Sequence, residues 1–263
     1  MKLFASDYDG TFCKHENRKR DEIKNNVFQS GRWREGGNIF AFATGRSISM
    51  MQLEKRRHGI EYDYIVGLNG AVIVDKSDNV LFRMSIKPSI AKEIIALIES
   101  KNIGNYSITD GFKGHFRAPL SLKSPSLLLF KLLGLFTRTY HLSKEEALKL
   151  PVAQIALTVE NPQEAVAFAD FINETFKGEA FAFANLVHVD IQAPGLSKAT
   201  GIEFIAQKYH LSETLIYGMG DSFNDIPMFE RFHGLTLPEA TKEIKEQAKG
   251  VYDTVGHALK DLM

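Results

Sequence analysis

Short apolar runs alternate with longer polar or amphipathic stretches in the first 70 residues of the chain. The apolar runs predict buried strands at residues 3–6, 39–43 and 64–67. The stretches between them predict helices at about residues 21–30 and 47–58, the first ending before glycine-rich sequence. Because strands that alternate with helices are typical of βαβ units, we expect a parallel sheet here.

The pattern changes after residue 70 and returns near residue 198. A hairpin is predicted from two apolar segments, 71–74 and 80–84, that flank a polar turn. A mixture of predicted strands and helices follows, including a helix at 163–176 with Ala167, Phe168, Phe171 and Ile172 facing inward. A helix at 198–210, a strand at 215–218 and the start of a helix at 224–229 then restore the βα rhythm. We therefore predict an α/β domain built from both ends of the chain, residues 1–83 and 192–263, with an α+β insert at 84–191.

Charge and length restrict the function classes. The 263 residues include 32 Lys plus Arg and 32 Asp plus Glu, so the formal net charge is zero and no global basic field attracts nucleic acid or an anionic membrane. The most apolar stretch, residues 127–136, is about half as long as a membrane helix, which needs ~20 residues, and suits a buried or interface helix better. The surrounding Leu- and Phe-rich segment 124–141 matches no pattern that we can place. We expect no nucleic acid or membrane partner, although a local basic patch stays open.

Cysteine content and the start of the chain point to a reducing compartment. Cys13 is the only cysteine, which excludes an internal disulfide and a cysteine-rich zinc site. An acidic residue, Asp7, comes before any signal-peptide apolar region can form. We therefore expect a cytoplasmic protein.

Three predicted strands end in acidic or glycine-containing turns. Asp7 and Asp9 follow the first strand, Thr44 follows the second, and Asp221 follows the strand at 215–218. In open α/β sheets ligands bind at the carboxyl ends of the strands, so these side chains meet if the strands are neighbours. Several buried carboxylates need a cation, and Mg²⁺ is a hard ion that takes oxygen ligands and commonly shares them with phosphate. The clustering itself indicates metal-assisted phosphoryl chemistry.

Four segments resemble, in order, the motifs of the haloacid dehalogenase superfamily. Asp7-Tyr8-Asp9-Gly10-Thr11 resembles its D-x-D-G-T signature and Thr44-Gly45-Arg46 its second motif. Lys198 stands where the third motif has a lysine, and Gly218–Asp225 resembles the fourth, G-D-S/N-x-N-D. The position of the insert resembles the C2B cap of the Cof-type sugar-phosphatase branch. The resemblance implies a three-layer Rossmannoid core with a parallel sheet and an inserted α+β cap.

The resemblance also implies a reaction. It is the hydrolysis of small phosphate esters, sugar phosphates first, by a Mg²⁺-dependent phosphatase through an aspartyl-phosphate. Asp7 would be the nucleophile, because a carboxylate can attack phosphorus. Asp9 would protonate the leaving alkoxide and then activate water. Lys198 would neutralise charge on Asp7 and on the phosphoryl group.

Further roles follow from the same resemblance. The metal ligands would be the Asp7 and Asp221 carboxylates and the backbone carbonyl of Asp9. Thr44 would hydrogen-bond a phosphoryl oxygen, and Asp225 would orient the groups around it. The expected phosphate-binding residues are Gly10, Thr44, Gly45, Asn69, Lys198 and Asn224.

Several alternatives stay open from the sequence. Asn69 and Gly70 form a good turn dipeptide, so a purely structural role and a place near the substrate weigh equally. Arg46 is expected to pair with a protein group rather than with substrate. A phosphomutase would use the same residues, and a non-catalytic binding protein would be expected to have lost one of the charged ones. The chain could be a monomer or a homodimer.

Overall fold

The structure, a computed structural model, describes residues 1–14, 20–103, 105–112, 114–117 and 142–263. The Leu- and Phe-rich segment 124–141 lies outside the described residues. By their contacts, the described residues form two compact units, Met1–Phe82 with Leu196–Met263, and Arg83–Gly195. Each unit is built around its own sheet.

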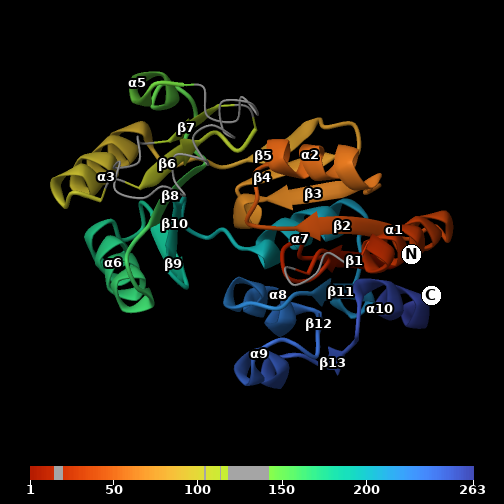
Figure 1. Ribbon diagram of the computed structural model, residues 1–263. Helices are drawn as coiled ribbons and strands as arrows, with labels where there is room; N and C mark the ends of the chain where they lie inside the picture. The colour runs from red at the N-terminus through yellow and green to blue at the C-terminus, as the bar shows by residue number, and fades with distance from the viewer. Residues whose placement is uncertain (15–19, 104, 113, 118–141) are drawn as a thin grey trace. The chain divides into compact units, whose positions relative to one another are not determined.

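The first unit contains an eight-stranded sheet with the order β13-β12-β11-β1-β2-β3-β4-β5 (Figure 1). Its strands are β1 (Leu3–Ser6), β2 (Ile39–Ala43), β3 (Tyr64–Gly67), β4 (Val72–Asp75), β5 (Val80–Arg83), β11 (Ile216–Met219), β12 (His233–Thr236) and β13 (Gly250–Val251). The strands from β13 to β3 pair in parallel, and β4 is antiparallel to β3. The expected fold class, an α/β core with a parallel sheet, is confirmed.

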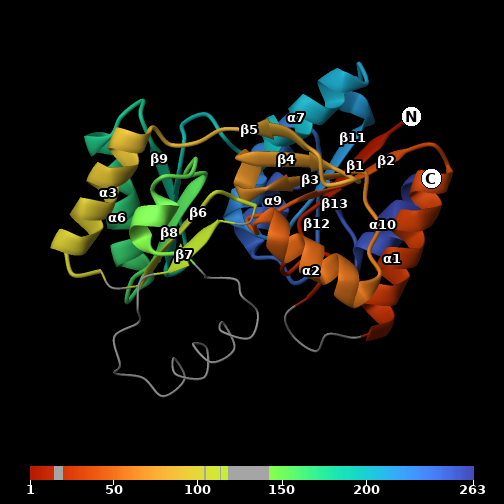
Figure 2. The same ribbon diagram turned by 90° about the horizontal axis from the view of Figure 1, so that it is seen from above.

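Helices cover both faces of this sheet, because its central strands are apolar and buried on both faces. The helices are α1 (Arg20–Glu35), α2 (Ile48–His58), α7 (Lys198–Lys208), α8 (Ile226–Arg231), α9 (Lys242–Gln247) and α10 (Val255–Leu262), with short 3₁₀ helices η1 (Leu68–Gly70), η2 (Glu213–Leu215) and η3 (Phe223–Asp225). Leu3 and Ala5 of β1 share a core with α7, α8 and α9, whereas Phe4 turns to the other face and contacts Trp33 of α1. There α1 and α10 run side by side, and Asn26 accepts a hydrogen bond from the Gly256 backbone (Figures 1 and 2).

The second unit has a five-stranded sheet with the order β7-β6-β8-β10-β9. Its elements are α3 (Pro88–Ser100), β6 (Tyr106–Thr109), β7 (His115–Arg117), α5 (Lys144–Ala147), β8 (Gln154–Thr158), α6 (Pro162–Thr175), β9 (Phe181–Asn185) and β10 (His188–Gln192). The neighbouring strands pair antiparallel, which is typical of an α+β unit. One core joins α3 and α6 to one face of the sheet.

Two sequence predictions about helices were wrong. The first helix continues through Gly31 to Glu35, because Trp33 is fully buried and its indole N–H donates to the Ile39 carbonyl at 2.8 Å. That packing outweighs the cost of a glycine inside a helix, about 0.5–1 kcal/mol.

The predicted inward face of α6 was correct for Phe168 and Ile172 and wrong for Ala167 and Phe171. Ala165, Phe168, Ala169 and Ile172 are buried, as the 3.6-residue period requires, while Ala167 and Phe171 are exposed. Phe171 instead packs under the Lys101 ammonium at 4.8 Å.

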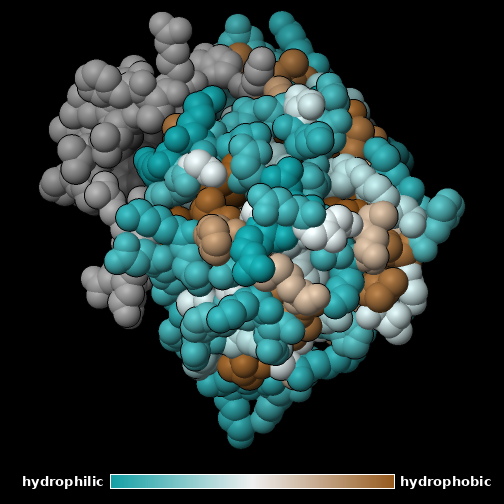
Figure 3. Space-filling view, turned by 90° about the vertical axis from the view of Figure 1, so that its right-hand side faces the viewer, coloured by the Kyte–Doolittle hydropathy of each residue, from teal (hydrophilic) through white to brown (hydrophobic). Residues whose placement is uncertain are grey.

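The surface of the protein is mixed in polarity. The face drawn in Figure 3 carries mostly hydrophilic residues with hydrophobic ones among them, an ordinary composition for a protein surface in water. Among the helices in the described part of the chain, none combines the length and apolar character needed to cross a membrane.

Candidate active site

The sheet order places the predicted site loops at one edge. β1 lies between β11 and β2, and Ser6, its last residue, pairs with Met219 and with Phe42. The Asp7 N–H then donates to the Met219 carbonyl at 2.8 Å, so the loops after β1 and β11 start side by side. Because these strands are parallel, their carboxyl ends meet at the same edge of the sheet, as the sequence predicted for the loops that carry Asp7, Thr44 and Asp221.

Lys198 is the centre of the side-chain arrangement. Its side chain is completely buried, and its ammonium donates to Asp225 Oδ1 at 2.5 Å, to Asp7 Oδ1 at 2.8 Å and to Asn224 Oδ1 at 3.4 Å. Burial acts to lower the pKa of Lys198, but Asp225 and Asp7 outweigh it and raise that pKa. The lysine is therefore a fixed positive charge at the sheet edge.

The chain positions Lys198 through the start of α7. Ser197 caps the helix in a reciprocal pair with Thr200, so Lys198 is its first residue. Gly70 in η1 lies against this cap with φ of +107°, and a Cβ placed there would be 2.4 Å from the Ser197 carbonyl oxygen. Only glycine fits this backbone conformation and this approach. The structure thus gives Gly70 a positional reason beyond a plain turn.

Three carboxylates gather at this edge of the sheet. Asp7, Asp221 and Asp225 each offer an oxygen within 4.8 Å of the others. Burial raises the pKa of Asp7 to about 8 although Lys198 opposes the shift, and the charges of Asp225 and Asp221 add to it. A divalent cation would offset this repulsion, and an all-oxygen donor set suits Mg²⁺. The residues present therefore fit a hard divalent metal.

Asp225 differs from the other two carboxylates in its contacts. Its Oδ1 accepts from Lys198, and its Oδ2 accepts from the backbone N–H groups of Asp221 and Ser222, both at 2.9 Å. These bonds fix the loop after β11 and the lysine together.

Asp221 is held by the loop after β1. Thr11 donates to Asp221 Oδ1 at 2.6 Å, and a Cβ on Gly10, whose φ is +80°, would lie 2.3 Å from Asp221 Oδ2. The sequence predicts Gly10 as a phosphate-binding residue. In the structure, the absence of a side chain at Gly10 leaves room for the Asp221 carboxylate.

Asn69 presents an unsatisfied donor at the same edge. It is 3% exposed with φ of +49°, and its Oδ1 accepts from Asn224 Nδ2 at 3.2 Å. Its Nδ2 is buried without a hydrogen-bond partner among the described residues, and it lies 3.6 Å from the Cβ position of Gly45. A buried unpaired donor costs about 1–3 kcal/mol, so this amide is suited to an oxygen-bearing ligand.

Asp9 pairs with a different cation from Asp7. Arg46 holds the Asp9 carboxylate in a two-pronged bond, Nε to Oδ2 and Nη2 to Oδ1, both at 2.6 Å. Thr44, which is buried, accepts the Arg46 backbone N–H at 3.1 Å. Arg46 therefore pairs with protein groups, as its sequence interpretation expected. The two carboxylates of the D-x-D segment are separated electrostatically, one on Lys198 and one on Arg46.

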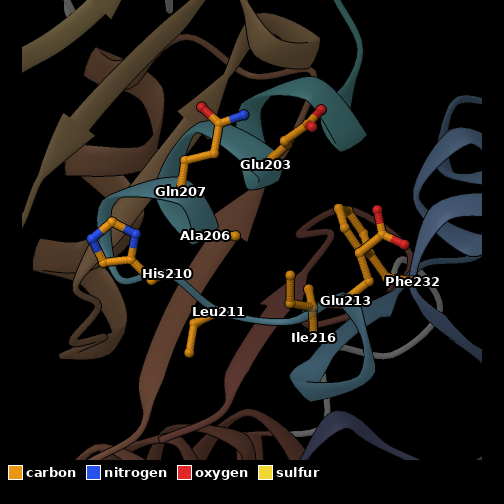
Figure 4. Close-up of a pocket in the computed structure, with 8 residues that line it drawn as sticks. All are labelled: Glu203, Ala206, Gln207, His210, Leu211, Glu213, Ile216 and Phe232. Atoms are coloured by element: carbon orange, nitrogen blue, oxygen red, sulfur yellow. The ribbon is translucent and has the colours of Figure 1, made fainter.

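A cavity elsewhere in this unit does not belong to the site. It has a volume of about 550 Å³ and lies between the C-terminal half of α7 and the first residue of β11 (Figure 4). Ala206, Leu211 and Ile216 form apolar parts of its wall. The candidate active site lies at the other end of each of these two elements, where Lys198 and Asp221 stand.

Comparison with known proteins decides the family. The sequence pattern of the haloacid dehalogenase-like hydrolases matches residues 4–257. The chain belongs to this family. The matched part includes all the predicted site residues, from Asp7 to Asp225. The resemblance drawn from the four motifs is therefore confirmed.

Individual relatives of this haloacid dehalogenase-like hydrolase agree with that assignment. A protein of Mycoplasma pneumoniae, provisionally named a phosphatase, is 27% identical over 99% of this chain and 95% of its own. A solved sugar phosphatase of haloacid dehalogenase subclass IIB has a TM-score of 0.77 at 20% identity over 100% of both chains. A haloacid dehalogenase-like hydrolase from B. subtilis has a TM-score of 0.79 at 21% identity, again over 100% of both chains. These structures show that the fold is shared.

Sequence reasoning missed three side chains that hold the site of this hydrolase. Tyr8 and Thr11 lie inside the D-x-D-G-T segment, so their position in the motif was an available signal. Glu54 had no such signal, because it stands in the middle of a polar helix and contacts Tyr8 and Arg46 only in the folded chain.

Proposed function

We propose that this chain is a Mg²⁺-dependent phosphatase that hydrolyses small phosphorylated metabolites, with sugar phosphates as the first candidates. One observation carries the proposal: a fully buried lysine bridges the carboxylates of Asp7 and Asp225 at the carboxyl edge of a parallel sheet. The provisionally named phosphatase of Mycoplasma pneumoniae supports it, as does the subclass IIB sugar phosphatase of the same fold.

Asp7 is the proposed nucleophile. One of its oxygens attacks the phosphorus atom, a P–O bond to the substrate breaks, and an aspartyl-phosphate forms. Lys198 lies 2.8 Å from Asp7 Oδ1 and so opposes the build-up of negative charge as the phosphoryl group arrives. Water then attacks phosphorus, which releases inorganic phosphate and regenerates the carboxylate.

Asp9 is the proposed proton carrier. It gives a proton to the leaving alkoxide in the first step and takes one from the attacking water in the second. Its pairing with Arg46 keeps its carboxylate apart from the Lys198 cluster. The two carboxylates can then take different roles although only one residue separates them.

The proposed phosphate pocket consists of the groups that surround Asp7 at the sheet edge. They are Gly10, Thr44, Gly45, Asn69, Lys198 and Asn224. The unpaired Asn69 amide supports this assignment, because a phosphoryl oxygen would satisfy it. Asp225 holds Lys198 and the loop after β11 in place.

Asp7, Asp221 and the backbone carbonyl of Asp9 are the proposed ligands of Mg²⁺. When bound, the ion neutralises negative charge on the carboxylates and on the phosphoryl oxygens. Thr11 and Gly10 keep Asp221 in position for this role.

The unit Arg83–Gly195 is the proposed cap, and we propose that its residues select the leaving group. The balanced charge and the single, buried cysteine support a cytoplasmic enzyme that acts on free metabolites. A phosphate ester is then the partner, with no nucleic acid or membrane required.

The test is phosphate release from a panel of sugar phosphates, other phosphorylated metabolites and an aryl phosphate. We expect release with Mg²⁺, loss of release with chelator, and loss of release in Asp7→Asn. An isomerised sugar phosphate in place of free phosphate would indicate a phosphomutase. Binding of phosphate esters without any turnover would indicate a non-catalytic protein, and activity that survives Asp7→Asn would exclude Asp7 as the nucleophile.

A further inference from the structure

Arg46 is held on three sides, and only one of them is Asp9. Besides the two bonds to Asp9, its Nη1 donates to Glu54 Oε1 at 3.0 Å. Its guanidinium carbon also lies 4.7 Å above the centre of the Tyr8 ring. A guanidinium is a planar fork, so fixing one side of it fixes the direction in which the other side points.

Glu54 is the residue that fixes this fork. It stands on α2, is 4% exposed and accepts the Tyr8 hydroxyl at 2.9 Å on Oε2. Arg57 donates to it at 3.1 Å, and His58 Nε2 lies 3.3 Å from Oε2. Burial raises the pKa of Glu54, but the bonds from Tyr8 and Arg46 outweigh it and leave that pKa lowered. Glu54 is therefore a buried, charged acceptor outside the set of groups that would touch substrate.

Tyr8 ties this arrangement to the loop after β1. Its side chain is 1% exposed and contacts Phe12 and Phe42 in the aromatic core. The hydroxyl and the ring face of this one residue hold Glu54 and Arg46 respectively. Because Tyr8 is the residue between Asp7 and Asp9, the anchor belongs to the same loop as the proposed nucleophile and proton carrier.

We propose that Glu54 is a positioning residue for proton transfer: it fixes Arg46, and Arg46 holds the Asp9 carboxylate in one orientation. This inference rests on the proposed phosphatase function. The Asp9 side chain is 35% exposed, and Arg46 supplies both of its side-chain bonds among the described residues. Without Glu54, Arg46 can turn towards water and Asp9 loses its orientation. A misplacement of about 1 Å can cost about 100-fold in rate.

The dependence on the leaving group separates this role from a merely structural one. An alkoxide is a poor leaving group and needs a proton, whereas p-nitrophenolate leaves without one. General acid catalysis contributes about 10²–10⁴-fold where a proton is needed. In Glu54→Gln we therefore expect kcat/KM for the best sugar phosphate to fall by about 10–100-fold, and kcat/KM for p-nitrophenyl phosphate to fall by less than about 3-fold.

Two further variants distinguish a positioning role of Glu54 from a general loss of folded structure. Tyr8→Phe removes only the hydroxyl that anchors Glu54, and we expect the same selective loss, smaller in size. Asp63→Asn is the matched control, because Asp63 forms a comparable two-pronged pair with Arg34, at 3.1 Å for each contact, away from the site. We expect this control to change the two substrates equally or to change neither.

A double variant tests whether Glu54 acts through Arg46. We expect Glu54→Gln to cause no further selective loss once Arg46→Met is present. Independent, multiplying losses would overturn the proposal, and so would an equal loss for both esters in Glu54→Gln and Tyr8→Phe, or no loss at all. If the wild type releases phosphate from no ester, the proposed function is refuted, and this inference is refuted with it. A wild type that is active but shows no selective loss in the variants overturns the positioning role alone.

Discussion

Replacing Lys198 with methionine tests the electrostatics of the site without relying on turnover. The lysine is the buried cation between Asp7 and Asp225, at 2.8 Å and 2.5 Å. Methionine has a similar length and no charge. The substitution leaves two buried carboxylates facing each other, and Asp7 already has a raised pKa with the lysine in place.

The expected loss of unfolding free energy is about 3–5 kcal/mol in the presence of chelator, since removing one partner of a buried ion pair leaves an uncompensated charge. Trp33 gives a local readout. It is the only tryptophan of the chain and is fully buried in the first unit. Its fluorescence during urea unfolding therefore reports the unit that contains the site, separately from the second unit.

Two comparisons make the Lys198 experiment decisive. Lys242→Met removes a lysine from an exposed pair with Glu246 in the same unit and should cost less than about 0.5 kcal/mol. Asp225→Asn, added to Lys198→Met, removes one of the two repelling charges and should restore part of the loss. A loss below about 1 kcal/mol for Lys198→Met in chelator would refute the view that this lysine compensates buried negative charge.

Three further predictions concern stability and metal binding. Gly70→Ala should cost about 1–3 kcal/mol more than Gly37→Ala, measured by Trp33 fluorescence, because both positions have a positive φ but only the first meets the Ser197 carbonyl. The pKa of Glu54 is lower in the folded chain than its value of 4.5 in the unfolded chain. The ionised carboxylate therefore stabilises the fold above the unfolded pKa, and this stabilisation is lost as pH falls through the folded pKa. Glu54→Gln should therefore lose less stability than the wild type between pH 6 and pH 3. Mg²⁺ at 100-fold excess over its Kd should stabilise the wild type by about 2.7 kcal/mol, which is measured as a rise in melting temperature. Asp221→Asn should abolish most of that rise.

The strands of the parallel sheet were predictable because their signal is local. Residues 3–6 and 39–43 are wholly or almost wholly apolar, are buried throughout, and end where polar or small residues begin. The end of α1 was not predictable in this way. Gly31 suggested a stop, and the burial of Trp33 that extends the helix depends on strands elsewhere in the sequence. Local sequence does not contain that packing.

The sequence after residue 231 contains a helical pattern near its end. Val255, Ala258 and Leu259 have helical spacing and are the buried side of α10. The neighbouring strand β12 contains His233 and Gly234, and β13 has only two residues, so the apolar pattern of both strands is weak. Whether such a segment forms a strand depends mainly on the strands beside it, and these neighbours are known only from the fold.

The residues of the candidate site could be predicted from the sequence, but most of the contacts that support them could not. Asp7, Thr44, Lys198 and Asp221 could be proposed from their motifs, and the strand order brings their loops to one edge. The contacts that hold them could not be proposed. Thr11 and Asp221 are 210 residues apart, and Tyr8 and Glu54 are 46 apart. No spacing rule links such pairs, so these supporting contacts are visible only in the folded chain, whereas the pairing of Lys198 with Asp7 was implied by the family resemblance.

The origin of the first unit from both ends of the chain has a consequence for its synthesis. β1 pairs with β2 early in the sequence, but its other partner, β11, emerges from the ribosome only after the whole second unit. The second unit is continuous and can complete its own sheet first. Lys198 is synthesised 191 residues after Asp7. A nascent chain that ends before residue 198 thus lacks the buried ammonium that contacts Asp7 in the folded protein.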